Sequence, residues 1–110
     1  MKLAQVTLTV EDVLAADPAD RRRTAVALAA AALAPAGIDL IVDHGDSVTY
    51  VFPGGWPVNV RFPVPIRDLI AAFYGERTTV RPVTFALMVP TEADVEAARA
   101  SIQETDRVAA

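Results

Sequence analysis

The sequence predicts a small α+β domain, in which helices pack on one face of a mostly antiparallel sheet of four or five strands. Three observations favour this class: a long alanine-rich helical stretch, several segments in which apolar and polar residues alternate, and short connections rich in turn residues. At 110 residues the chain can bury a core of its own, so residues 1–110 are expected to form one domain.

The first third of the chain is expected to hold a strand, a helical turn and the longest helix. Residues 3–10 alternate between apolar and polar side chains, which is typical of a half-buried strand, and residues 11–16 can form a helical turn. The long helix is predicted to begin at Asp17, whose carboxylate can cap its first turn, and to end near Ala34, because Pro35 cannot continue the hydrogen-bond ladder. Its second half is apolar all round, so the helix is expected to be buried.

The middle of the chain predicts three strands in succession. Residues 38–42 and 48–52 form a predicted hairpin, because residues 43–47 between them are rich in turn formers. Proline and glycine residues at 53–57 then break the chain, and residues 58–62 alternate as a third strand.

The last third of the chain predicts a helix, a strand and a final helix. Apolar residues within 66–75 are spaced to lie on one helical face. Residues 83–89 are apolar on both faces, which predicts an inner strand that is covered on both sides. Thr91 and Asp94 make a capping-box-like start to a helix that reaches towards Val108 and carries a thin apolar stripe.

The predicted order of elements is therefore β-α-β-β-β-α-β-α. If one strand were merged or omitted, the order would become β-α-β-β-α-β with an added C-terminal helix, which is the ferredoxin-like arrangement. Neither topology fixes a function, since common folds carry many activities.

Composition and charge limit the kinds of partner and compartment. The chain has no cysteine, which agrees with a cytoplasmic location, and no uncharged run is long enough to cross a membrane. The net charge of −4 and the pI of about 4.8 disfavour general binding to nucleic acid. The hydrophobic fraction of 53% is high for a soluble chain, and acidic and basic blocks alternate along it, so contact between copies of the chain is expected.

The residues that commonly carry catalysis do not form a recognisable pattern here. The single histidine, His44, lies in the predicted hairpin loop, where turn formation explains its neighbours better than a cation site or an acid–base pair does. The pair Gly54-Gly55 is not followed by the residues of a phosphate-binding loop. We therefore expect no catalytic residue, no metal site and no cofactor, and we regard an enzymatic role as the less favoured interpretation.

Two kinds of surface residue are candidates for protein contact. Trp56 either folds over the end of the sheet or serves as an exposed anchor, since tryptophan is over-represented among the residues that dominate binding energy. Both basic and acidic residues are candidates as well. The basic ones are Arg21, Arg22 and Arg23 at the start of the long helix, and the acidic ones are Glu92 and Glu96 on the last helix.

A second group of residues could bind an anionic small molecule. Arg61, Arg67, Tyr74 and Tyr50 are candidates to line a cleft between the sheet and the second helix. Acidic neighbours could neutralise these arginines, in which case they would form only a charged surface.

The sequence thus leaves three functional hypotheses. The first is a non-enzymatic interaction or structural module that works through self-association or a protein partner. The second is a small anionic-ligand-binding domain or minimal enzyme that uses the arginine-lined cleft. The third is an acidic inhibitor or immunity-type protein that presents the carboxylates of its last helix, including Glu92 and Glu96, to a basic partner.

Overall fold

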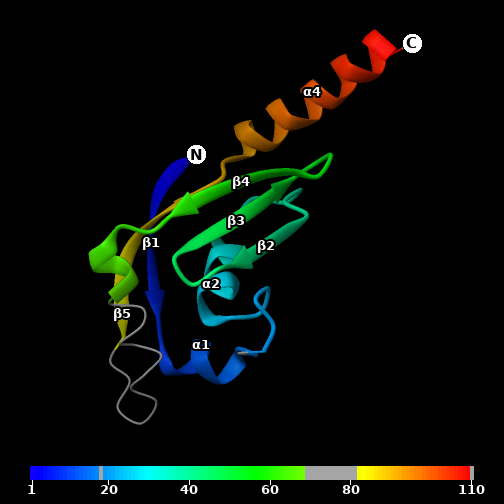
Figure 1. Ribbon diagram of the computed structural model, residues 1–110. Helices are drawn as coiled ribbons and strands as arrows, with labels where there is room; N and C mark the ends of the chain where they lie inside the picture. Colours follow the sequence, from blue (N-terminus) through cyan, green and yellow to red (C-terminus); the bar gives the residue numbers. More distant parts are fainter. Residues whose placement is uncertain (18, 69–81, 110) are drawn as a thin grey trace.

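The computed structural model describes residues 1–17, 19–68 and 82–109 (Figure 1). Its elements follow one another as β1 (Lys2–Leu8), α1 (Val10–Ala15), α2 (Ala25–Leu33), β2 (Leu40–Asp43), β3 (Ser47–Phe52), β4 (Trp56–Arg61), β5 (Val83–Val89) and α4 (Glu92–Ala109). Residues 64–68 are helical as well, whereas the rest of the helix predicted at 66–75 lies outside the described residues.

The α+β class, the antiparallel pairing and the order of the elements are confirmed. The five strands are divided between two sheets: β1 pairs with β5, and β2, β3 and β4 form a three-stranded meander. The structure therefore keeps all three middle strands, and it does not adopt the ferredoxin-like alternative, which required one strand fewer.

Helix α2 begins later than the sequence suggested. Its N-cap is Thr24, whose side chain accepts a hydrogen bond from the backbone N–H of Ala27 at 3.2 Å. The predicted start at Asp17 is wrong, because that carboxylate accepts from the N–H of Ala19 at 3.0 Å in a separate turn. The predicted end is confirmed, since the last helical residue is Leu33.

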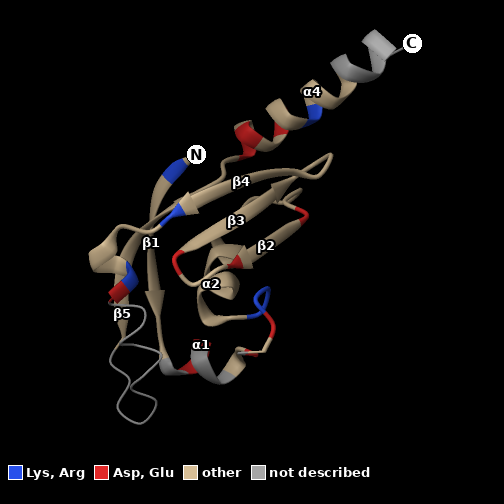
Figure 2. Cartoon of the chain, in the orientation of Figure 1, with Lys and Arg blue, Asp and Glu red and all other residues tan. Residues whose placement is uncertain are grey.

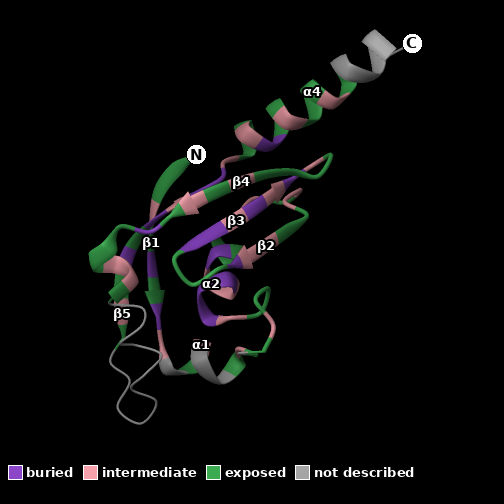
Figure 3. Ribbon diagram, viewed as in Figure 1, coloured by how far each residue is buried: buried purple, intermediate pink, exposed green. Residues whose placement is uncertain are grey.

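The core lies between α2 and the inner faces of both sheets (Figure 3). The first half of α2 is buried, as expected, although its last residue, Leu33, is 40% exposed. The prediction that β5 is covered on both faces is wrong: its side chains alternate, and Thr84 and Ala86 are exposed. The fully or nearly buried apolar residues of the strands are Val6, Leu8, Val48, Tyr50, Phe52, Phe85, Leu87 and Val89.

Two hydrogen-bonded links connect these layers. The Thr24 hydroxyl donates to Oδ2 of Asp43 at 2.9 Å, which ties the start of α2 to the end of β2, and Asp43 itself is only 7% exposed. The Tyr50 hydroxyl donates to the carbonyl oxygen of Met88 at 2.8 Å and so joins β3 to β5 across the two sheets. Burial raises the pKa of Tyr50 well above its ordinary value, so this hydroxyl keeps its proton.

Helix α4 projects from the rest of the molecule (Figure 1). The radius of gyration is 15.6 Å, whereas a compact chain of this length is expected at about 13 Å. The start of α4 is the predicted capping box: the Thr91 N–H donates to Oδ2 of Asp94 at 2.8 Å, and the Asp94 N–H donates to Oγ1 of Thr91 at 3.2 Å. Of the described α4 side chains, Val95 is buried in the core.

No helix in the described part of the chain is both long and apolar enough to span a membrane.

Candidate functional site

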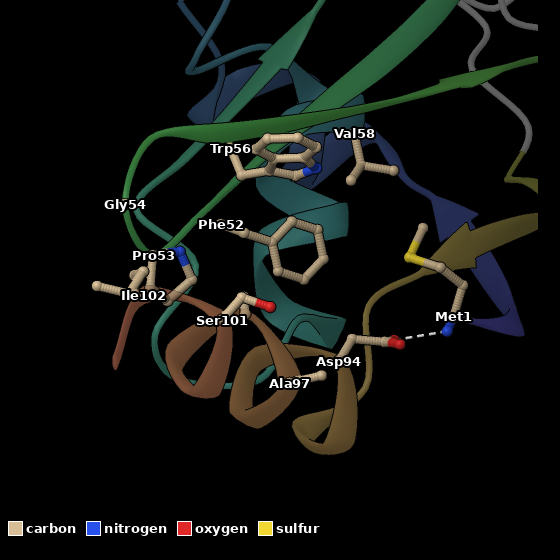
Figure 4. Close-up of a pocket in the computed structure, with 11 residues that line it drawn as sticks. Met1, Phe52, Pro53, Gly54, Trp56, Val58, Asp94, Ala97, Ser101 and Ile102 are labelled. Atoms are coloured by element: carbon tan, nitrogen blue, oxygen red, sulfur yellow. Dashed lines mark hydrogen bonds and ion pairs between the residues drawn. The ribbon is translucent and has the colours of Figure 1, made fainter. Parts of the chain in front are cut away.

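A groove of about 570 Å³ separates the turn between β3 and β4 from the first three turns of α4 (Figure 4). Most of the side chains that line it are apolar, and they come from the N-terminus, the β3–β4 hairpin and α4. The lining residues are Met1, Phe52, Pro53, Gly54, Trp56, Val58, Asp94, Ala97, Ala98, Ser101 and Ile102.

The hairpin forms one wall of the groove. Gly54 and Gly55 both have positive φ, at 86° and 80°, and the N–H of Gly55 donates to the carbonyl oxygen of Phe52 at 3.0 Å. This tight turn places Trp56 directly opposite Phe52, so that both rings lie on the same face of the sheet. Phe52 is buried at 4% exposure, whereas Trp56 is 71% exposed and forms the rim.

Helix α4 forms the other wall. Residues four apart lie on one face of a helix, which brings the pairs Ala97 and Ser101, and Ala98 and Ile102, to the side that faces the hairpin. A Cβ on Gly54 would lie 2.8 Å from Cδ1 of Ile102, so the glycine lets the hairpin turn approach the helix closely. The small side chains of Ala97 and Ser101 leave the space between the two walls open.

The groove carries one charged side chain, and that charge is compensated. Oδ2 of Asp94 lies 2.5 Å from the N-terminal ammonium group of Met1. The hydrogen bond from this ammonium group lowers the pKa of Asp94 to about 2, with a further contribution from the backbone N–H of Thr91. The lining is therefore close to neutral as well as apolar.

Two of the residues predicted to line an arginine cleft, Arg61 and Tyr50, lie on opposite faces of the three-stranded sheet. Arg61 lies opposite Ser47 on the outer face of the three-stranded sheet, 4.0 Å from Oδ2 of Asp46, whereas the Tyr50 ring is fully buried on the inner face. Arg67 is half-buried, and its Nε has no hydrogen-bond partner among the described residues. Tyr74 lies outside the described residues.

None of the charged candidates for protein contact lines the groove. Figure 2 shows charged residues in the turn that precedes α2 and on α4. Arg21, Arg22 and Arg23 are exposed in the turn that precedes α2, which corrects their predicted place in its first turn. Nε of Arg22 donates to Oδ1 of Asp20 at 3.2 Å, and the hydrogen bonds from Arg22 lower the pKa of that carboxyl.

Glu92 and Glu96 are exposed on α4, two residues before and after Asp94. Two residues along a helix correspond to about 200° of rotation. Since Asp94 lines the groove, these two carboxylates lie on the opposite side of the helix.

The hairpin end around His44 is a polar surface. Nε2 of His44 lies 3.0 Å from Oγ1 of Thr49, and the Asn59 side-chain amide donates to Ser47 and Thr49 at 3.1 and 3.0 Å. Among the residues that the structure describes, no group of three or more His, Cys, Asp or Glu side chains could hold a metal ion. These contacts link the loop to the adjoining strands β3 and β4.

Sequence reasoning identified one wall of the groove and missed the other. The Gly-Gly-Trp segment marked Trp56, but Ala97 and Ser101 are ordinary helix residues with no local signal of binding. Only the thin apolar stripe that contains Ile102 hinted that α4 packs against something. No protein-family model, curated protein or solved structure matches this chain, so a function has to be inferred from the groove itself.

Proposed function

We propose that this protein is a non-enzymatic interaction module that binds a protein surface through the groove between the β3–β4 turn and α4. The observation that supports this most directly is the exposure of Trp56, which is 71%, at the rim of an apolar groove. Exposed apolar surface beside a concavity is typical of interaction sites, and tryptophan is among the residues that most often dominate binding energy.

The size of the Trp56 ring sets the scale of the interaction. With 71% of the residue exposed, the ring offers on the order of 150 Å² of surface to a partner. Burying that area is worth about 4 kcal/mol before the costs of association are subtracted. Trp56 alone therefore anchors a contact but does not make it tight, and the α4 wall has to supply the rest.

The chemistry of the lining supports binding without catalysis. Apart from Asp94 and Ser101, the lining side chains are apolar. The Asp94 carboxylate accepts hydrogen bonds from the N-terminal ammonium group and from Thr91, which holds its pKa well below neutrality and disfavours a role in proton transfer. We place the module in the cytoplasm as part of the same proposal, because the chain has no cysteine.

The proposal is tested by measuring mass and Trp56 emission together. Trp56 is the single tryptophan of the chain, so its fluorescence reports on the groove directly. We expect light scattering to show an increase in mass between micromolar and millimolar protein, and Trp56 emission to shift to shorter wavelength over the same range. Two results together would contradict the proposal. The mass would stay that of a monomer at every concentration, and a pull-down with the native chain would recover no protein that a pull-down with the Trp56→Ala variant fails to recover.

A small apolar molecule is the second candidate for the groove. The volume of about 570 Å³ falls within the range of about 300–1,000 Å³ that is usual for ligand pockets. Saturable one-to-one binding of ANS, a dye whose aromatic rings bind apolar surface, to the monomer would favour this candidate if the Ala97→Phe variant loses it. Dye binding that the Ala97→Phe change leaves unaltered would count against it.

A further inference from the structure

We propose that the occupant of the groove is a second copy of this chain, with the Trp56 ring of each copy covering the α4 wall of the other about a two-fold axis. This inference rests on the proposed function and specifies its partner. A two-fold contact uses the same surface patch on both copies, so the patch has to contain both a projecting group and a surface that receives it. Trp56 and the adjacent wall at Ala97 and Ser101 supply both within one groove.

The charge of the groove suits a partner that is itself neutral there. The one charged lining side chain, Asp94, is paired with the N-terminal ammonium group. Glu92 and Glu96 lie on the opposite side of α4, so two copies that meet through the groove do not bring these carboxylates together. The net charge of −4 thus resides elsewhere on the chain, and the repulsion that would normally oppose self-association is small at this surface.

The outer edge of β4, the strand that carries Trp56, is poorly suited to strand-to-strand pairing between copies. The carbonyl oxygen of Val51 accepts from Asp39 on the β2 side, so the backbone of Val51 points away from β4. Its partner Pro57 therefore directs its backbone outwards, away from β3. Because proline has no N–H, this edge lacks a donor at that position, and side chains in the groove are the better route to contact.

The area available predicts a reversible dimer. Each ring offers on the order of 150 Å² and covers a similar area of the opposite wall, so two such contacts bury on the order of 600 Å². Standard stable interfaces bury about 1,200–2,000 Å². The expected dimer is therefore weak, and it dissociates on dilution.

A complementation experiment tests the reciprocal seating of Trp56. Trp56→Ala keeps its groove and loses the ring, whereas Ala97→Phe keeps the ring and fills its own groove. We expect each variant alone to require about 30-fold more protein to associate than the native chain, as for a residue that dominates an interface. Ala100→Phe is the matched control: it makes the same change at an exposed position that does not line the groove, and it should associate like the native chain.

Mixing the two defective variants should restore one of the two contacts. The Trp56→Ala variant contains no tryptophan, so all emission in the mixture comes from Trp56 of the Ala97→Phe variant. We expect this emission to shift to shorter wavelength as the Trp56→Ala variant is added, and to stay unchanged when the Ala97→Phe variant alone is added. Circular dichroism of each variant checks that the fold is retained.

The outcomes separate this inference from the proposed function. If the native chain self-associates but the mixture shows no shift, or if Ala97→Phe associates like the native chain, reciprocal seating is wrong while self-association stands. If the native chain stays monomeric at every concentration, the second copy is excluded, and the proposed function then survives only if another protein partner binds in a way that depends on Trp56.

Discussion

The hydroxyl of Thr24 makes two contacts at once, so its removal is expected to destabilise the fold strongly. It accepts from the N–H of Ala27 as the cap of α2, and it donates to the buried carboxylate of Asp43. Loss of a helix cap costs about 1 kcal/mol, and loss of a hydrogen bond to a charged group costs about 1.5–3 kcal/mol. We therefore expect Thr24→Val to lower the free energy of unfolding by about 2–4 kcal/mol, against a total of about 5–15 kcal/mol for a typical domain.

Urea unfolding, followed by circular dichroism and by Trp56 emission, measures this loss. Thr24→Ser is the matched control, because serine keeps a hydroxyl that can both accept and donate. On heating, Thr24→Val should lower the melting temperature by roughly 8–16 °C, while Thr24→Ser should stay close to the native value. A valine variant within about 0.5 kcal/mol of the native chain, which is the usual range of a surface substitution, would show that the link between α2 and β2 does not carry the stability assigned to it.

Three further changes test other parts of the structure. Tyr50→Phe removes the hydroxyl that donates to a carbonyl oxygen of β5. The free energy of unfolding, measured in urea at neutral pH, should fall by about 1–3 kcal/mol. Since burial raises the pKa of Tyr50 above its ordinary value of 10.0, the unfolded chain ionises first, and stability should fall as pH rises above 10.0, less steeply in Tyr50→Phe. The pKa of Asp94 is lowered from 3.8 to about 2, so its contribution is present above pH 3.8 and lost as pH falls towards 2; unfolding midpoints measured against pH should show this loss, and Asp94→Asn should lack it. Gly37→Ala should lower the stability by about 1–3 kcal/mol more than Gly45→Ala in thermal unfolding. Both glycines have positive φ, but a Cβ at Gly37 would lie 2.8 Å from Cγ1 of the buried Val95, whereas a Cβ at Gly45 would meet nothing within 4 Å.

A specific result would contradict each of these three predictions. An alkaline loss of stability that is the same with and without the Tyr50 hydroxyl would mean that this group ionises in the folded protein. If Asp94→Asn leaves acid unfolding unchanged, the contact between Asp94 and the N-terminus does not contribute to stability at low pH. If Gly37→Ala and Gly45→Ala lower the stability equally, α4 can move to make room for a side chain at Gly37 and is not held rigidly there.

Local patterns in the sequence predicted those parts of the fold that local interactions decide. The alternation in residues 3–10 places Val6 and Leu8 in the core, and the turn formers at 43–47 join two strands as expected. The capping box of Thr91 and Asp94 is also formed, because its hydrogen bonds need only residues three apart. These elements could be placed without knowledge of the rest of the chain.

Contacts between distant residues decided the parts that sequence reasoning missed. Asp17 carries a good capping signal, but Thr24 also gains the contact with Asp43, which no local pattern contains. In the same way, the apolar residues of β5 suggested two covered faces, whereas its pairing with β1 leaves Ala86 exposed. The division of five strands between two sheets likewise depends on pairing at long range.

The candidate site shows the same limit. Trp56 could be marked from its neighbours in the sequence, and the Gly-Gly turn before it explains why the ring ends at the rim. The α4 wall consists of small residues that are ordinary in any helix. Its role arises only because the close approach of Gly54 to Ile102 brings the hairpin turn next to the helix.

The pairing of β1 with β5 has a consequence for synthesis of the protein in the cell. Lys2 pairs with Val89, so β1 has to wait until the chain has been synthesised as far as β5 before it finds its neighbour. At translation rates of about 5–20 residues per second, this strand spends several seconds with its apolar side chains uncovered. Nascent chains of this protein are therefore expected to be clients of ribosome-associated chaperones during that interval.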